Sequence, residues 1–71
     1  MKKVVIYGLG PIAELAKFYF ANDSNMEVVA FTVENAYKDK DIFYDLPVVA
    51  FEDIENSYTP AEVLLFIAVS S

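Results

Sequence analysis

Four short apolar runs, separated by polar segments, set the pattern of this chain. They cover residues 3–7, 27–33, 46–50 and 63–69, and almost no polar side chain interrupts them. Continuous apolar runs of this length are typical of strands that are buried on both faces, as in parallel sheets. The sequence therefore predicts four strands, one over each run, with Pro47 tolerated near the start of the third.

A different periodicity lies between the first two runs. Ile12, Leu15, Ala16 and Tyr19 follow the i, i+3, i+4, i+7 spacing of an amphipathic helix and are expected to face the sheet. Pro11 suits the first helical position, so the helix is predicted over residues 11–21. Strand, helix and strand at this spacing form a right-handed crossover. The predicted fold class is α/β: a small Rossmann-like βαβ unit with a parallel sheet of three to four strands.

The other segments give weaker signals. Residues 34–45 are expected to be irregular, with a solvated run of alternating charges at 38–41. Residues 51–55 can form a helical turn, and the acids there read as a solvated face. Thr59 and Glu62 have the spacing of a capping box, but the last apolar run follows at once, so any helix there is a single turn.

The first strand and the helix are joined by a turn that carries chemistry. Gly8, Gly10 and Ala13 occupy the three small positions of the G-x-G-x-x-G/A phosphate-binding turn. Gly8 allows the sharp exit from the strand, and Gly10 lets a phosphate approach the backbone. The turn directs the free N–H groups of a helix start, near Pro11 and Ile12, at an anion. The alternative is a tight connection that binds nothing.

Two further positions are candidates for the same ligand. Glu34 follows the second predicted strand, 21 residues after Ala13, where an acid commonly accepts the ribose hydroxyls of a dinucleotide. Ser70 follows the last predicted strand, and its hydroxyl can bind a phosphate or a sugar. The alternatives are a solvated carboxylate and an ordinary strand exit. Thr32 is expected to pack within its strand.

Three aromatic residues, Tyr37, Phe43 and Tyr44, lie in the segment after Glu34. One of them could stack on a base, although packing is the usual role of such residues over a small core.

Composition narrows the classes of function. The 71 residues suffice for one small domain, with a net charge of −6 and no Arg, which argues against nucleic-acid binding. Without His or Cys there is no thiolate or imidazole metal site and no catalytic triad, so we predict no metal and no catalytic residue. Binding of Mg²⁺ or Ca²⁺ by carboxylates alone stays open, although no calcium-loop spacing is present. No apolar run is long enough for a membrane helix. The absence of Cys fits a cytoplasmic protein.

Together, these segments resemble the N-terminal domain of bacterial sugar O-acyltransferases, the group of sialic acid O-acetyltransferases and pilin-glycosylation acetyltransferases. The resemblance covers nearly the whole chain and is carried by order and spacing: residues 3–10, the second run ending near Glu34, Leu46-Pro47-Val48-Val49 with residues 51–54, and 65–69. That family often has Gly or Ser and then His where Pro11 and Ile12 stand, so this chain has one donor and one polar side chain fewer there.

The resemblance implies that residues 1–71 form a Rossmann-like domain that binds a nucleotide-linked sugar, typically UDP-linked. Gly8, Gly10, Pro11, Ile12, Glu34 and Ser70 would contribute to its pocket. It also implies a following left-handed β-helix that binds acetyl-CoA, forms a homotrimer and supplies a catalytic His. We therefore expect the chain to be the N-terminal part of a longer acetyltransferase of surface-glycan biosynthesis, not catalytic alone and without a cofactor of its own.

Two other functions stay open on the sequence. The glycine turn and Glu34 also suit the NAD(P)-binding domain of an oxidoreductase. The absence of Arg and His, together with apolar Ile12, suits a non-catalytic structural or regulatory module.

Overall fold

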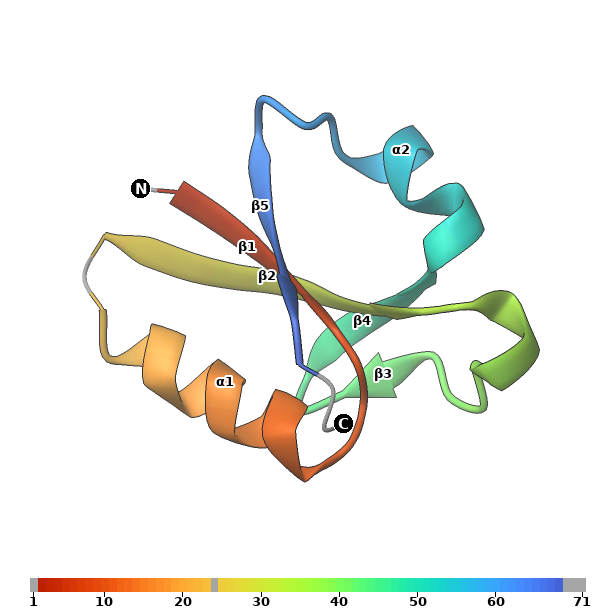
Figure 1. The fold of residues 1–71 in the computed structure, drawn as a ribbon, viewed down its shortest axis with the longest axis horizontal. Coiled ribbons are helices and arrows are strands. Elements are labelled where there is room, and N and C mark those ends of the chain that lie inside the picture. Colours follow the sequence, from red (N-terminus) through yellow and green to blue (C-terminus); the bar gives the residue numbers. More distant parts are fainter. Residues whose placement is uncertain (1, 24, 69–71) are drawn as a thin grey trace.

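The computed structural model describes residues 2–23 and 25–68. These residues form strands β1 to β5, helices α1 and α2, and two short 3₁₀ helices, η1 and η2 (Figure 1). In chain order the elements are β1 (Lys2–Tyr7), α1 (Pro11–Ala21), β2 (Met26–Val33), η1 (Asn35–Tyr37), β3 (Ile42–Phe43), β4 (Leu46–Ala50), η2 (Phe51–Asp53), α2 (Ile54–Ser57) and β5 (Val63–Ile67).

The strands form one sheet in the order β3-β4-β2-β1-β5. The pairs β4–β2, β2–β1 and β1–β5 are parallel, and β3 is antiparallel to β4. From β1 the chain adds β2 and then β4 on one side of the sheet. It then returns and adds β5 on the other side of β1. Helices α1 and α2 lie on opposite faces of the sheet (Figure 1). The Rossmann-like α/β prediction is confirmed, with four parallel strands.

The core lies where β1 and β2 pass between these layers. Val4, Ile6 and Phe31 are fully buried, as expected for strands covered on both faces. Ala13, Ala16 and Phe20 supply the contact from α1. The apolar runs therefore predicted the strands, but the expected burial on both faces was wrong for β5, where residues 64–67 are exposed. The predicted helix over 11–21 has the bounds of α1.

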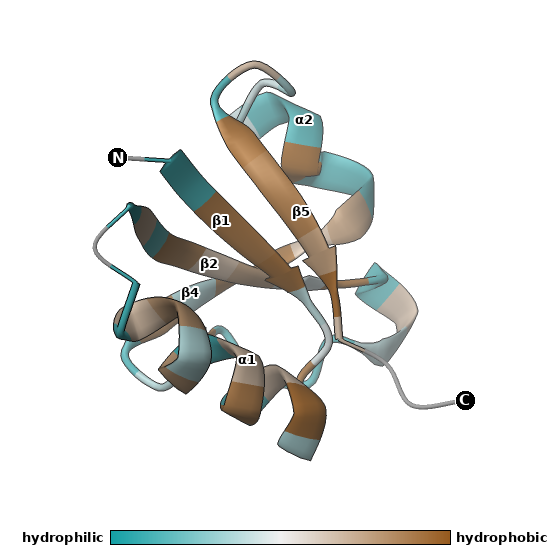
Figure 2. Ribbon diagram, turned by 60° about the vertical axis from the view of Figure 1, so that its left-hand side comes forward, coloured by the Kyte–Doolittle hydropathy of each residue, from teal (hydrophilic) through white to brown (hydrophobic). Residues whose placement is uncertain are grey.

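The predicted inner face of α1 was wrong for three of its four residues, and only Ala16 is buried as expected. Ile12, Leu15 and Tyr19 are exposed, whereas Ala13, Ala16 and Phe20 face the sheet. Two alanines on the inner face let the helix axis approach the strands closely, which larger side chains would prevent. Apolar residues occur around much of α1 (Figure 2), so periodicity could not select the buried stripe.

The segment predicted as irregular contains a hairpin. Ile42 and Phe43 pair with Pro47 and Leu46 across a turn at Tyr44 and Asp45, whose φ angles are 50° and 63°. Left-handed angles at both central residues are those of a type I′ turn, which Asn-Gly usually signals. That signal is missing here, so the sequence did not reveal the hairpin.

Packing of the aromatic residues in this hairpin is confirmed. The ring of Phe43 lies 4.9 Å from that of Phe31 and 4.7 Å from that of Tyr44, measured between centroids. Tyr44 also contacts Phe18 of α1, at 5.9 Å. The Glu14 carboxylate near its hydroxyl raises the pKa of Tyr44. The hairpin is thereby attached to the outer side of α1.

The Thr59–Glu62 segment forms a single turn, as predicted. The Glu62 carboxylate accepts hydrogen bonds from the Thr59 N–H, at 3.1 Å, and from the Thr59 hydroxyl, at 2.8 Å. These bonds favour the charged form and lower the pKa of Glu62 below its usual 4.5. The turn fixes the entry of the chain into β5.

This lowered pKa predicts an acid-sensitive contribution to stability. Because the folded pKa lies below the unfolded one, the contribution of Glu62 is complete above pH 4.5 and is lost as the pH falls through the folded pKa. We expect the free energy of unfolding of Glu62→Gln to fall less steeply with decreasing pH than that of the wild type. Urea unfolding between about pH 6 and pH 3 measures this slope. Part of the pH dependence should remain in the variant, because Lys38 lowers the pKa of Asp41 in the same way. Identical slopes for both proteins would contradict the prediction.

Candidate functional site

The carboxyl ends of the parallel strands meet at one edge of the sheet, and the predicted glycine turn lies there. The Gly8 N–H donates to the Thr32 carbonyl at 2.9 Å, and the Ala68 N–H donates to the Tyr7 carbonyl at 2.8 Å. The turn is thus held between the ends of β2 and β5. These two strands lie on opposite sides of β1, so the direction in which successive strands are added to the sheet reverses here. In open α/β sheets, ligands bind outside the strand ends at this reversal.

Gly8 has a structural role. Its φ angle is +128°, which L side chains rarely adopt, and a Cβ atom there would lie 2.7 Å from the Ala68 carbonyl oxygen. The residue is buried under the chain that leaves β5. Gly8 therefore allows close packing of the turn against β5 and does not itself face a ligand.

Gly10 shows the opposite pattern. It is exposed, has an ordinary φ of −90°, and a Cβ atom there would meet nothing within 4 Å. Neither backbone conformation nor packing demands glycine at this position. The missing side chain leaves open space directly over the backbone at the start of α1, which is what a phosphate group needs for close approach.

The start of α1 has unused hydrogen-bond donors. Gly10 is the N-cap residue, and no side chain caps the helix. Pro11 has no N–H, and the Glu14 N–H donates to the Gly10 carbonyl at 3.1 Å. Among the described residues, no acceptor bonds the N–H groups of Ile12 and Ala13. These groups and the positive end of the helix dipole favour an anion.

Glu34 lies at the same edge, directly after β2. It is half-buried, and its carboxylate makes no hydrogen bond or ion pair with the described residues. The neighbouring Asn35 N–H donates to Glu52 at 2.9 Å, so the Glu52 carboxylate is already engaged. Glu34 thus lies directly after β2, as predicted, and its carboxylate is a free acceptor, among the described residues, one strand away from the glycine turn.

Thr32, between these elements, is a packed residue. It is fully buried, and its hydroxyl donates to the Val49 carbonyl at 2.6 Å. This bond joins β2 to β4 and leaves no hydroxyl for a ligand, which confirms the packing interpretation.

Of the sequence-predicted residues, Gly8, Gly10, Pro11 and Ile12 form one turn and Glu34 lies at the same edge. Ser70 lies outside the described residues. Ile12 contributes its N–H, while its side chain is apolar and partly exposed.

The structure adds Phe51 to this edge. It follows β4 directly, remains 38% exposed, and its ring packs edge-on against Tyr7 with centroids 5.3 Å apart. A partly exposed aromatic ring at this edge is suited to contact a base. The sequence analysis did not select Phe51, although an aromatic residue directly after a buried apolar run could have indicated it. Tyr37 in η1, shortly after β2, is another aromatic residue and is 74% exposed.

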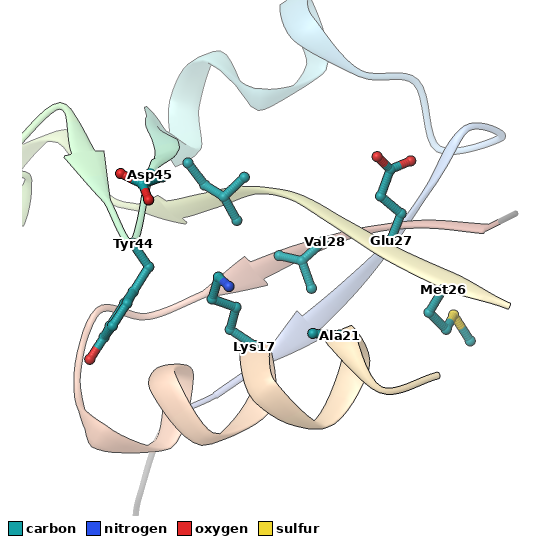
Figure 3. Close-up of a pocket in the computed structure, with 8 residues that line it drawn as sticks. Lys17, Ala21, Met26, Glu27, Val28, Tyr44 and Asp45 are labelled. Atoms are coloured by element: carbon teal, nitrogen blue, oxygen red, sulfur yellow. The ribbon is translucent and has the colours of Figure 1, made fainter. Parts of the chain in front are cut away.

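A separate cleft of about 430 Å³ lies at the other end of α1 (Figure 3). Lys17 and Ala21 of α1, the start of β2 and the hairpin turn at Tyr44 and Asp45 surround it. Met26 and Val28 form its floor, and the Glu27 carboxylate points away from α1 (Figure 3). This cleft is at the amino end of β2, so it is distinct from the glycine turn.

Two kinds of feature are absent from residues 2–23 and 25–68. No three acidic side chains gather in a way that could hold a metal ion. Neither helix has the length and apolar character needed to cross a membrane.

Comparison of the chain with protein-family models, curated proteins and solved structures finds no match.

Proposed function

We propose that this chain binds a nucleotide-linked sugar, with UDP-sugars as the first class to test, for an acetyl-CoA-dependent sugar O- or N-acetyltransferase. The observation that carries the binding proposal is the open backbone at Gly10. An uncapped helix start, a glycine that the fold does not require, and a free carboxylate on the next strand lie at the edge where α/β sheets bind nucleotides.

Each part of such a ligand has a partner. The diphosphate would accept hydrogen bonds from the Ile12 and Ala13 N–H groups at the positive end of α1. The ribose hydroxyls would donate to Glu34. The base would lie toward Phe51, beyond the end of β4.

The acyl-transfer part of the proposal is supported by the family resemblance. The chain has no His and no Cys to act as a base or nucleophile. Its contribution would be to bind and orient the sugar, and acetyl-CoA would supply the acyl group in another domain of the enzyme. Purified residues 1–71 would then bind the nucleotide-sugar and transfer no acetyl group.

A second candidate, an NAD(P)-binding domain, is favoured by Glu34. Its place directly after β2, beside the turn, also suits the adenosine ribose of a dinucleotide. UDP-N-acetylglucosamine and NADH therefore distinguish the two functions when each is titrated into the same protein.

The decisive variant is Gly10→Asp. An Asp N-cap bonds the free N–H groups and complements the helix dipole, so we expect the free energy of unfolding to rise by about 0.5 kcal/mol. The same carboxylate fills the anion position, so the affinity for UDP-N-acetylglucosamine should fall at least about tenfold. Calorimetric titration and urea unfolding measure the two effects. Only an anion site at this helix start predicts higher stability together with weaker binding.

Glu34→Gln tests the ribose contact. Loss of a charged acceptor is expected to weaken binding about tenfold, whereas Glu27→Gln, at the far end of the same strand, should leave it unchanged. If UDP-N-acetylglucosamine does not bind the wild-type chain at millimolar concentration, the proposal fails. Binding of NADH in its place would support the second candidate.

A further inference from the structure

Strand β5 is the outer strand of the sheet on one side. It pairs with β1 along one edge, and within the described residues no strand pairs with its other edge. Its sequence, Val63–Ile67, contains no charged residue and no Pro. Exposed edges are usually protected by such residues, because free N–H and C=O groups otherwise recruit another strand.

The orientation of the free groups follows from the contacts after β5. The Ala68 N–H bonds to Tyr7, and the Ala68 carbonyl oxygen lies against Gly8, so the peptide groups of Ala68 face β1. Successive residues of a strand alternate in direction. Leu64 and Phe66 therefore also direct their N–H and C=O groups toward β1, and Val63, Leu65 and Ile67 direct theirs outward.

Apolar side chains accompany this edge. Ile12, Leu15 and Tyr19 of α1 line a groove of about 260 Å³ together with Phe66. Figure 2 shows the apolar character of β5 along its length. Six large apolar residues here are each between 37% and 71% exposed: Ile12, Leu15, Tyr19, Leu64, Phe66 and Ile67. Together they expose roughly 700 Å², close to the ~800 Å² that each partner buries in a standard interface.

We propose that two copies of this chain pair through β5, antiparallel and centred on Leu65, and so join their sheets into one. In this register Leu65 exchanges two hydrogen bonds with its own counterpart, and Val63 does so with Ile67 of the other copy. Leu64 lies opposite Phe66 on the α1 face. The pairing uses every outward peptide group of β5 and has the two-fold symmetry of a closed dimer.

A second copy fits this edge because the edge is complementary to itself. Apolar residues meet apolar residues at each paired position, and the strand brings no carboxylate into the contact. The two chains each carry a net charge of −6, so they repel one another at longer range. Added salt screens this repulsion and should strengthen the dimer.

The test is sedimentation equilibrium of the 71-residue chain over a range of protein and salt concentrations. We expect a dimer of twice the chain mass whose dissociation constant falls as salt rises. Leu65→Lys places two ammonium groups beside the two-fold axis and should raise that constant at least about tenfold. Ile67→Lys, at a more exposed position, should act in the same direction while leaving the fold intact.

The matched control is Ile42→Lys in β3, an exposed apolar residue on the opposite edge of the sheet, which should leave the dimer unchanged. Circular dichroism confirms that each variant is folded. A monomeric wild type, an open series of larger species, or a dimer that both β5 variants leave intact would overturn the proposal. A dimer broken only by Leu15→Lys would assign the contact to α1 instead.

Discussion

Replacement of Gly8 by alanine is expected to cost this protein about 3 kcal/mol or more of folding free energy. The φ of +128° is strained for any L residue, and the added Cβ would lie 2.7 Å from the Ala68 carbonyl oxygen, which cannot move without separating β5 from β1. A chain of 71 residues has roughly 4–10 kcal/mol of stability. The variant should therefore be largely unfolded in mild urea, as measured by circular dichroism.

Gly10→Ala is the matched control for this prediction. Its Cβ enters open space at an ordinary φ, so the cost should be about 1 kcal/mol or less, from the poorer N-cap. Equal destabilisation by the two substitutions would show that the glycines share one role. A clear difference assigns Gly8 to packing and shows that the fold does not require glycine at position 10.

Phe31→Ala should have an effect of similar size through a different cause. Phe31 is fully buried in β2 and packs edge-on against Phe43, so its truncation leaves a cavity between the sheet and the hairpin. Substitutions of this kind cost about 3–5 kcal/mol, which is a large part of the total stability here. Urea denaturation should show a lower midpoint and early loss of the near-ultraviolet aromatic signal.

Tyr37→Ala provides the comparison for Phe31. Its side chain is exposed in η1, so its removal should change stability by about 0.5 kcal/mol or less. If Phe31→Ala were equally mild, the apolar contact between β2 and the hairpin would not contribute to the core.

The elements that the sequence predicted well are those with long, uniform signals. The bounds of α1 and β4 matched, and β1 and β2 differed by one residue. Parallel pairing followed from apolar runs that only a doubly covered strand can bury. The hairpin at Tyr44 and Asp45 was missed because its turn uses left-handed residues other than Gly or Asn.

The sequence predicted the position of the carboxyl-edge site and the separate roles of its two glycines, but not what packs over Gly8. Strand-turn-helix order placed Gly8 and Gly10 beside Glu34, since carboxyl ends of parallel strands share one edge. The motif assigns Gly8 to the tight turn and Gly10 to the approach of a phosphate. The structure adds the packing over Gly8, because only the position of Ala68, sixty residues later in the chain, shows what covers it.

By itself the sequence determined the alternation of elements, their parallel arrangement and the location of the turn, because these depend on local periodicity and on glycine and proline chemistry. The tertiary structure decided which face of α1 is buried, what packs over Gly8 and that the outer edge of β5 has no paired strand among the described residues. Those properties depend on contacts between distant segments: apolar residues surround α1 and fill β5, and only the packed neighbours determine which of them water can reach.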